Sequence, residues 1–137
     1  MPASPIPTER ELEILKILWD QGEASVRDVY ERMREKVPIV QNTVQAFLRT
    51  MEDKGLVRHR VSGRTFIYKP VVPREQTTRR LTTQFVQHVF DGAIDQLVES
   101  VFSHRAPTEE ELGHLESLLA DARSARMRRT RSERRRP

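Results

Sequence analysis

Hydrophobic residues in the first part of the chain recur with helical spacing in three successive segments. Residues 8–21 carry leucine and isoleucine at three- and four-residue intervals, and they begin with the residue types of a capping box. A second, short segment begins at Ser25 and ends before Pro38, because proline cannot continue a helix. The third segment covers residues 41–54. The pattern therefore predicts three consecutive helices.

The third helix has two chemically different faces. Val44, Leu48 and their apolar neighbours one turn away predict a side packed against other helices. At about 100° per residue, the opposite side and its flanks are mostly polar. The outward residues, with the start of the helix, are Gln41, Asn42, Thr43, Gln45, Ala46, Arg49 and Thr50. Amides can pair with adenine, arginine with guanine, and methyl groups with thymine, although an ordinary solvated helix has a similar surface.

The hydrophobic period changes from helical to alternating after this helix. Residues 57–61 alternate, Ser62-Gly63 is a two-residue turn signal, and residues 64–69 form the returning run. The resulting β-hairpin is basic and suits phosphate or the minor groove. Its cations are Arg58, Arg60, Arg64 and Lys69. Three helices followed by a basic hairpin predict a winged helix-turn-helix DNA-binding domain over residues 8–72.

A second helical block covers residues 73–122. It carries 4 basic and 9 acidic side chains, a balance of −5, so it should not lie along phosphates. Its short amphipathic helices make a poor core alone, and we therefore expect a helical dimerisation domain. The candidate dimer-interface residues are Leu81, Phe85, Val89, Leu97, Val101, Leu115 and Leu118. The alternative is that these apolar stripes pack among themselves or on the first domain.

The two ends of the chain have distinct compositions. Residues 1–7 contain three prolines and predict a disordered lead-in. Residues 123–137 carry 8 arginines and Glu133, a balance of +7, and predict a disordered arginine-rich tail. The net charge of +4 is thus a property of this tail. The tail either runs along phosphates beside a binding site or is a solvated terminus without a role.

Composition excludes several classes of function. The chain has no cysteine, which excludes disulfides, zinc–thiolate sites and thiol nucleophiles. The four histidines, expected at the surface or its boundary, are scattered without metal-ligand spacing, and a glycine-rich phosphate loop is missing. We expect no enzyme activity, cofactor, metal or small-molecule ligand. The histidines are His59, His88, His104 and His114. No apolar run approaches the roughly 20 residues of a membrane span, and no signal peptide is recognisable, so we expect a cytoplasmic protein without membrane insertion.

Several short segments, in this order and spacing, resemble the BlaI/MecI/CopY family of bacterial repressors over about residues 6–120. They are Glu11–Trp19, Thr43–Leu48, Lys54–Arg58, Gly63–Tyr68, Val89–Gly92, Leu97–Val98 and Thr108–Leu112. The resemblance implies an N-terminal winged helix and a C-terminal helical dimerisation domain. It further implies a homodimer that occupies a dyad-symmetric, double-stranded operator and blocks transcription.

The resemblance also implies a route of induction. In the β-lactam branch of the family, a membrane sensor-protease cuts the repressor within its dimerisation domain, and the aligned bond here is Ser100–Val101. Two departures affect the third helix. Val40-Gln41 replaces the serine that commonly precedes it, so that Asn42 is the alternative helix cap, and Arg49-Thr50 replaces Asn-Arg. The missing cysteine cluster argues against copper sensing.

A winged helix can also serve as an adaptor that contacts only proteins. Such a protein would bind no duplex specifically, whereas a phosphate-binding dimer loses affinity steeply as salt rises. The sequence therefore leaves two functions open, an operator-binding repressor and a protein-binding adaptor, and the salt dependence of duplex binding distinguishes them.

Overall fold

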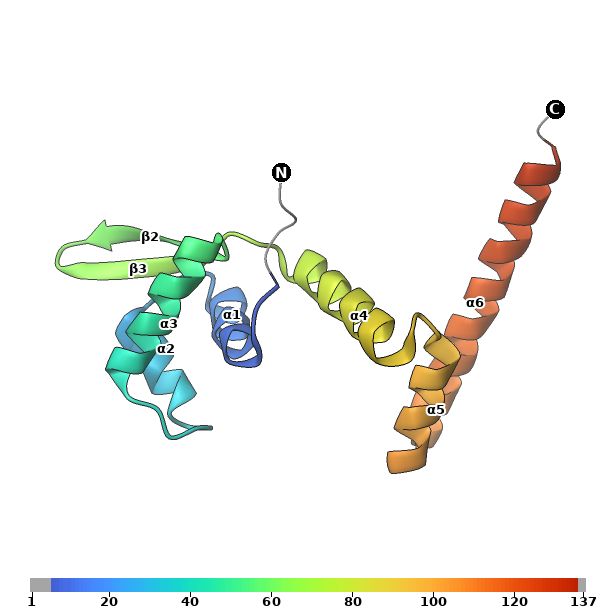
Figure 1. Cartoon of the computed structure of the whole chain (residues 1–137), viewed down its shortest axis with the longest axis horizontal. Helices are drawn as coiled ribbons and strands as arrows, with labels where there is room; N and C mark the ends of the chain where they lie inside the picture. Colours follow the sequence, from blue (N-terminus) through green and yellow to red (C-terminus); the bar gives the residue numbers. More distant parts are fainter. Residues whose placement is uncertain (1–5, 136–137) are drawn as a thin grey trace. The chain divides into compact units, whose positions relative to one another are not determined.

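The computed structural model describes residues 6–135, which form two compact units that divide between Val89 and Phe90. The first unit combines helices with a small sheet, and the second is helical (Figure 1). The elements are α1 (Glu9–Gln21), β1 (Ala24–Ser25), α2 (Val26–Met33), α3 (Gln41–Lys54), β2 (Val57–Ser62), β3 (Thr65–Pro70), α4 (Arg74–Phe90), α5 (Ile94–His104) and α6 (Glu109–Arg134). The predicted mainly helical winged helix-turn-helix fold is confirmed.

Capping boxes start two of the first three helices. The Thr8 hydroxyl accepts a hydrogen bond from the Glu11 amide, and the Glu11 carboxylate accepts one from the Thr8 amide at 2.9 Å. Ser25 and Asp28 form the same reciprocal pair at the start of α2. Gly55 ends α3 in the left-handed region, with φ at 85°, which glycine adopts without a steric penalty. These local signals confirm the predicted helix starts and the predicted stop of α3.

The start of α3 differs from this pattern. Val40 is the N-cap residue and provides no side-chain hydrogen bond, because its side chain carries no acceptor. Asn42 lies inside the first turn of the helix, so the expectation that it caps α3 is wrong. The first backbone carbonyl that accepts within this turn is that of Val40, which takes the amides of Thr43 and Val44. The amides of Gln41 and Asn42 therefore have no partner within the helix.

The core of the first unit joins α1, α2, α3 and the sheet. Leu15 and Leu18 of α1, Val29 of α2 and Leu48 of α3 are fully buried, and Tyr68 of β3 is 1% exposed. Burying each such side chain stabilises the fold by roughly 1.5–3 kcal/mol. Since the apolar side of α3 is held in this core, its polar side faces away from the unit.

The sheet is antiparallel with strand order β1-β3-β2. Ser62 pairs with Thr65, so the two connecting residues are Gly63 and Arg64. This connection begins one residue later than the predicted Ser62-Gly63 turn, because Gly63, with φ at 64°, takes the first turn position. Arg64 therefore lies at the tip of the β2–β3 hairpin, which we call the wing. The two-residue strand β1 is too short to show an alternating pattern and was not expected.

The boundary between the units also differs from the expected one, which placed the break between residues 72 and 73. Trp19 of α1 donates its indole N–H to the Val72 carbonyl at 3.0 Å, and the Arg74 guanidinium lies 6.0 Å from the Trp19 ring centre. These contacts tie the start of α4 to the first unit. Of the expected disordered lead-in, residues 1–5 lie outside the described residues, and Pro7 is buried.

The expected disorder of residues 123–137 is wrong over most of its length, because α6 continues to Arg134. Alanine and arginine are good helix formers, and this intrinsic propensity does not depend on an apolar stripe. Within the second unit, neither α5 nor α6 has a buried residue. The apolar side chains of both helices therefore remain accessible in a single chain.

Candidate nucleic-acid interface

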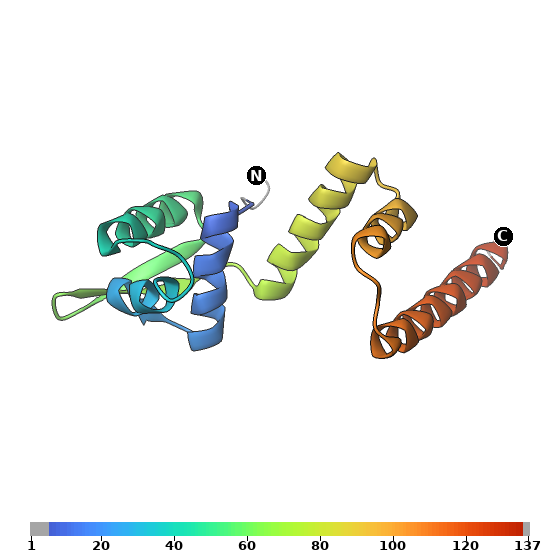
Figure 2. The same ribbon diagram turned by 90° about the horizontal axis from the view of Figure 1, so that it is seen from below.

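A groove on the first unit lies between α3, the start of α2 and the wing. Figures 1 and 2 show the tip of the wing projecting beyond the helices of this unit. We call this surface the helix–wing groove. Its lining residues are Ser25, Val26, Arg27, Gln41, Gln45, Arg49, Arg64, Thr65 and Phe66.

The helix–wing groove joins base-reading chemistry with cations. Gln41, Gln45 and Arg49 are four residues apart and so form one row along α3. Arg64 from the wing tip and Arg27 from α2 add two guanidinium groups, and no lining residue is acidic. Amide and guanidinium groups read base edges, and guanidinium groups also bind phosphate. The arrangement has the chemistry of a duplex-binding surface.

The other predicted residues of α3 lie outside this groove. Thr43, Ala46 and Thr50 line a shallow depression on a different side of α3, beside Glu11 and Lys54. Asn42 is exposed and lines neither surface. The 100° step of the helix separates the row at 41, 45 and 49 from the row at 43, 46 and 50. The predicted set is therefore accessible, with six residues divided between two rows and Asn42 in neither.

The wing arginines of β2 lie on the side of the sheet away from His59 and Tyr68, because side chains alternate along a strand. Arg60 donates to the Glu23 carboxylate at 2.8 Å, and both side chains are about half exposed. The hydrogen bond from Arg60, with its positive charge, lowers the pKa of Glu23, and Glu23 in turn raises the pKa of Arg60. Arg58 is exposed, and neither arginine lines the helix–wing groove.

A contact between α3 and β2 fixes the base of the wing. The Glu52 carboxylate accepts a hydrogen bond from the His59 amide at 2.9 Å and lies 2.7 Å from His59 Nδ1. The His59 ring stacks on Phe66 with centres 4.2 Å apart, and Phe66 lines the helix–wing groove. His59 is half-buried at the surface boundary, as expected. Glu52 was not singled out from the sequence. The one local feature that could have indicated its contact with β2 is its position one turn before Gly55, where α3 ends.

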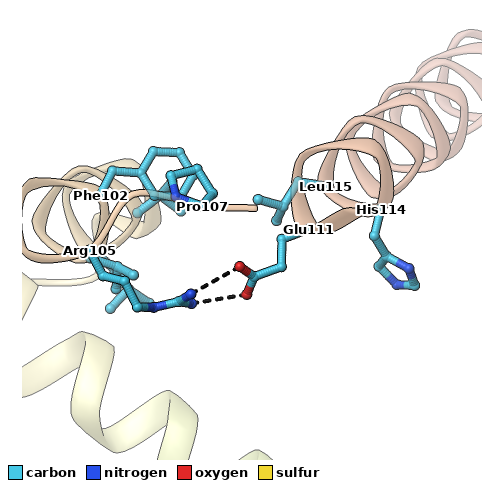
Figure 3. Close-up of a pocket in the computed structure, with 9 residues that line it drawn as sticks. Phe102, Arg105, Pro107, Glu111, His114 and Leu115 are labelled. Carbon is cyan, nitrogen blue, oxygen red and sulfur yellow. Dashed lines mark hydrogen bonds and ion pairs between the residues drawn. The ribbon is translucent and has the colours of Figure 1, made fainter. Parts of the chain in front are cut away.

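The second unit carries an apolar groove between α5 and α6, with a volume of about 410 Å³. Figure 3 shows Phe102 and Pro107 on one side of it and Leu115 on the other. Leu97, Val98 and Val101 add to the apolar lining. We call this surface the α5–α6 groove.

An ion pair lies at the α5–α6 groove. The Arg105 guanidinium donates two hydrogen bonds to the Glu111 carboxylate, both at 2.9 Å (Figure 3). These hydrogen bonds, followed by one from the Thr108 amide, lower the pKa of Glu111 to about 2. The pair bridges the connection between α5 and α6, so that the capping box at the start of α6 is also held by the end of α5.

The predicted dimer residues fall on both units. Leu97, Val101 and Leu115 line the α5–α6 groove, and Leu118 of α6 is 53% exposed. The α4 residues are Leu81, which is half-buried, and Phe85 and Val89, which are about half exposed. The aligned cleavage bond, Ser100–Val101, lies inside α5 rather than in a loop.

The described residues, 6–135, contain no group of three histidine, cysteine or acidic side chains arranged to hold a metal ion. Over the same residues, no helix combines the length and the apolar character that crossing a bilayer requires.

Comparison with known proteins identifies the group to which these features belong. The family model of the penicillinase repressor matches residues 7–121, which include both units except the end of α6. The chain belongs to the penicillinase repressor family. The resemblance read from the sequence is thereby confirmed, and membership places the chain among transcriptional repressors rather than enzymes.

Individual relatives of the family are distant in sequence. The penicillinase repressor of Bacillus licheniformis is 21% identical over 114 residues, which cover 83% of this chain and 89% of the relative. The methicillin resistance regulatory protein MecI of Staphylococcus aureus strain N315 is 19% identical over 109 residues, covering 80% and 89%. The solution structure of the Bacillus licheniformis BlaI monomeric form in complex with the blaP half-operator aligns with a TM-score of 0.48 at 25% identity, over 55% of this chain and 92% of that chain.

Proposed function

We propose that this penicillinase-repressor-family chain binds a dyad-symmetric DNA operator as a homodimer and so represses transcription. The observation that carries the proposal is the helix–wing groove, whose lining joins Gln41, Gln45 and Arg49 with Arg64 and Arg27 and includes no acidic residue. In this arrangement α3 enters the major groove, and its polar row contacts base edges. Arg64 and Arg27 bind the flanking phosphates.

The start of α3 supports the same orientation. The backbone amides of Gln41 and Asn42 have no acceptor within the helix, and Val40 supplies no side-chain cap. Free amides at a helix N-terminus are donors for phosphate, and the helix dipole adds to this attraction. A DNA backbone crossing the start of α3 would complete the helix cap that the protein leaves open.

The second unit supports the dimerisation part of the proposal. Neither α5 nor α6 has a buried residue. The apolar side chains of Val101 and Phe102 are about 40% exposed at the α5–α6 groove, and that of Leu118 is 53% exposed. A second copy of the chain covers these side chains, so that two winged helices act together. A two-fold symmetric protein binds two half-sites related by a dyad.

Release from the operator requires loss of the dimer in this proposal. A cut at Ser100–Val101 by a membrane sensor-protease is one route, since it divides α5 beside the α5–α6 groove. The bond lies within a helix, so the protease would act on a locally unfolded α5. Incubating the chain with a candidate protease and sequencing the fragments would locate the cut.

The DNA contact is tested by selecting duplexes from a random library with the full chain, then measuring affinity for the selected duplex and a scrambled one. Arg49→Ala should weaken binding to the selected duplex about 5- to 150-fold while leaving the scrambled duplex nearly unchanged. Arg64→Ala should weaken both duplexes. Arg34→Ala, which removes an exposed arginine that does not line the helix–wing groove, is the matched control. Selection of no duplex would favour the protein-binding adaptor.

The dimer is tested separately by sedimentation. Val101→Asp places a charge in the α5–α6 groove and should convert a dimer into a monomer. His104→Asp places the same charge on the same helix, outside the lining of that groove, and should leave the dimer intact. A Val101→Asp protein that remains a dimer would contradict this part of the proposal.

A further inference from the structure

The last part of α6 is strongly basic and lies outside the family match, which ends at residue 121. We call residues 123–135 the basic segment. It contains seven arginines and one acidic residue, Glu133. The arginines are Arg123, Arg126, Arg128, Arg129, Arg131, Arg134 and Arg135. The family's shared function does not account for this segment.

The arginines of the basic segment are solvated on all sides. At about 100° per residue they are distributed around the whole helix, and all seven are exposed. Within the part of the chain that the structure describes, none of them takes part in an ion pair. The segment is a cationic rod about 20 Å long, at 1.5 Å per residue, with its charges available to an external partner.

The side chains of the basic segment restrict the class of partner. Met127, 61% exposed, is its one large apolar residue and has arginines around it, so the segment lacks the apolar face of a membrane-surface helix. It contains no aromatic residue on which unpaired bases could stack. Its charges are complementary to duplex DNA, which carries one phosphate per about 1.7 Å of axis.

We propose that the basic segment binds the phosphate backbone of double-stranded DNA without regard to sequence, as a second contact besides the helix–wing groove. The acidic first half of α6, which includes Glu110 and Glu116, would be repelled by phosphates and limits the contact to the basic segment. The contact raises the affinity for every duplex and leaves the discrimination between sequences to α3. It does not depend on the proposed operator, because any duplex supplies the phosphates.

The test compares three full-length proteins on a mixed-sequence 30-base-pair duplex over a range of salt concentrations. They are the unmodified chain, a variant with all seven arginines changed to glutamine, and a matched variant with all seven changed to lysine. With about three arginines on phosphates at once, glutamine should reduce the slope of log affinity against log salt by about 3. Lysine should preserve the slope, because the contact depends on charge and not on geometry.

Circular dichroism confirms that each variant keeps its helical content, since glutamine, lysine and arginine have similar helix propensities. Affinity for the duplex at low salt should fall about 10- to 100-fold in the glutamine variant. An unchanged slope and affinity would overturn the proposal. So would a glutamine variant that loses binding to anionic phosphatidylserine vesicles or to single-stranded RNA while its duplex binding stays intact.

A failure of this proposal is distinguishable from a failure of the proposed function. Arg49→Ala should reduce the preference for the selected duplex over the scrambled one without changing the effect of the glutamine substitutions. The glutamine variant should lower both affinities by a similar factor and leave that preference unchanged. A variant that instead loses the preference would show that the basic segment reads sequence, which contradicts the proposal.

Discussion

Lys54, the last residue of α3, places its Nζ 2.9 and 3.0 Å from the two carboxylate oxygens of Glu11 in the first turn of α1. Glu11 is only 2% exposed, and the same carboxylate accepts the Thr8 amide of the capping box. One buried carboxylate therefore joins the start of α1 to the end of α3. Burial raises the pKa of Glu11, but hydrogen bonds from Thr8 and Lys54 outweigh this effect and lower the pKa below its ordinary value.

Lys54→Met should destabilise the first unit by about 1–3 kcal/mol, because it leaves a buried carboxylate without its cation. Urea denaturation measures the change. Arg10→Met, which removes the cation of the exposed Arg10–Glu13 pair, should cost less than about 0.5 kcal/mol.

The same contact predicts a pH dependence. Since folding lowers the pKa of Glu11, its contribution is present above the ordinary value of 4.5 and is lost as pH falls through the lower folded value. The stability difference between the unmodified chain and Lys54→Met should therefore shrink below pH 4.5. A difference that stays constant down to the acid transition would show that Lys54 does not act through the charge of Glu11.

Glu23→Gln should increase affinity for any duplex about twofold to fivefold at low salt. Glu23 holds the Arg60 guanidinium at 2.8 Å, and its removal frees a wing cation for phosphate. Asp20→Asn removes the same charge from the exposed Asp20–Arg32 pair, which includes no wing residue, and is the control. The gain should disappear when Arg60 is also changed to glutamine. If Glu23→Gln and Asp20→Asn raised duplex affinity equally, the gain would come from the change in net charge and not from release of Arg60.

Glu52→Ala should weaken duplex binding about tenfold, because Glu52 holds the amide and ring of His59 and so positions the wing beside α3. The loss should be smaller when Arg64 is already changed to alanine, because Glu52 and Arg64 would both act through the contact between the wing and DNA. Glu31→Ala, at an exposed pair on α2, is the control for loss of an acid. If the losses of duplex affinity were additive in the double variant, Glu52 would not act through the wing.

Arg105→Gln should raise the pKa of Glu111 from about 2 toward its ordinary value of 4.5, because the two hydrogen bonds from Arg105 are the main cause of the lowered value. In the unmodified chain, the contribution of this pair to the start of α6 is present above pH 4.5 and is lost as pH falls toward 2. Titration of the Glu111 carboxyl carbon by NMR measures both values. A value near 2 in the variant would assign the shift to the Thr108 amide instead.

Features of the fold that depend on neighbouring residues could be read from the chain alone. Such features are the Thr8 and Ser25 capping boxes, the end of α3 at Gly55 and the alternation along the wing. Each depends on residues only a few positions apart, so a short stretch of sequence contains all the information needed to predict it. The amphipathic pattern of α3 likewise established which side is buried, because the helix period is constant. The prediction of disorder over residues 123–137 rests on the missing apolar stripe, whereas the helix propensity of the arginines and alanines, which is also local, favours the helix that the structure shows up to Arg134.

Contacts between distant segments were decided only by the tertiary structure. Glu11 with Lys54, Glu23 with Arg60, and Arg27 beside the row of α3 are brought together by packing, and no periodicity records which polar groups will meet. The physical reason is that the apolar core determines how helices and sheet pack, while polar partners are selected by the geometry that results. The sequence thus determined the first three helices, the wing and the buried side of α3, and the packing determined which charges remain available to DNA.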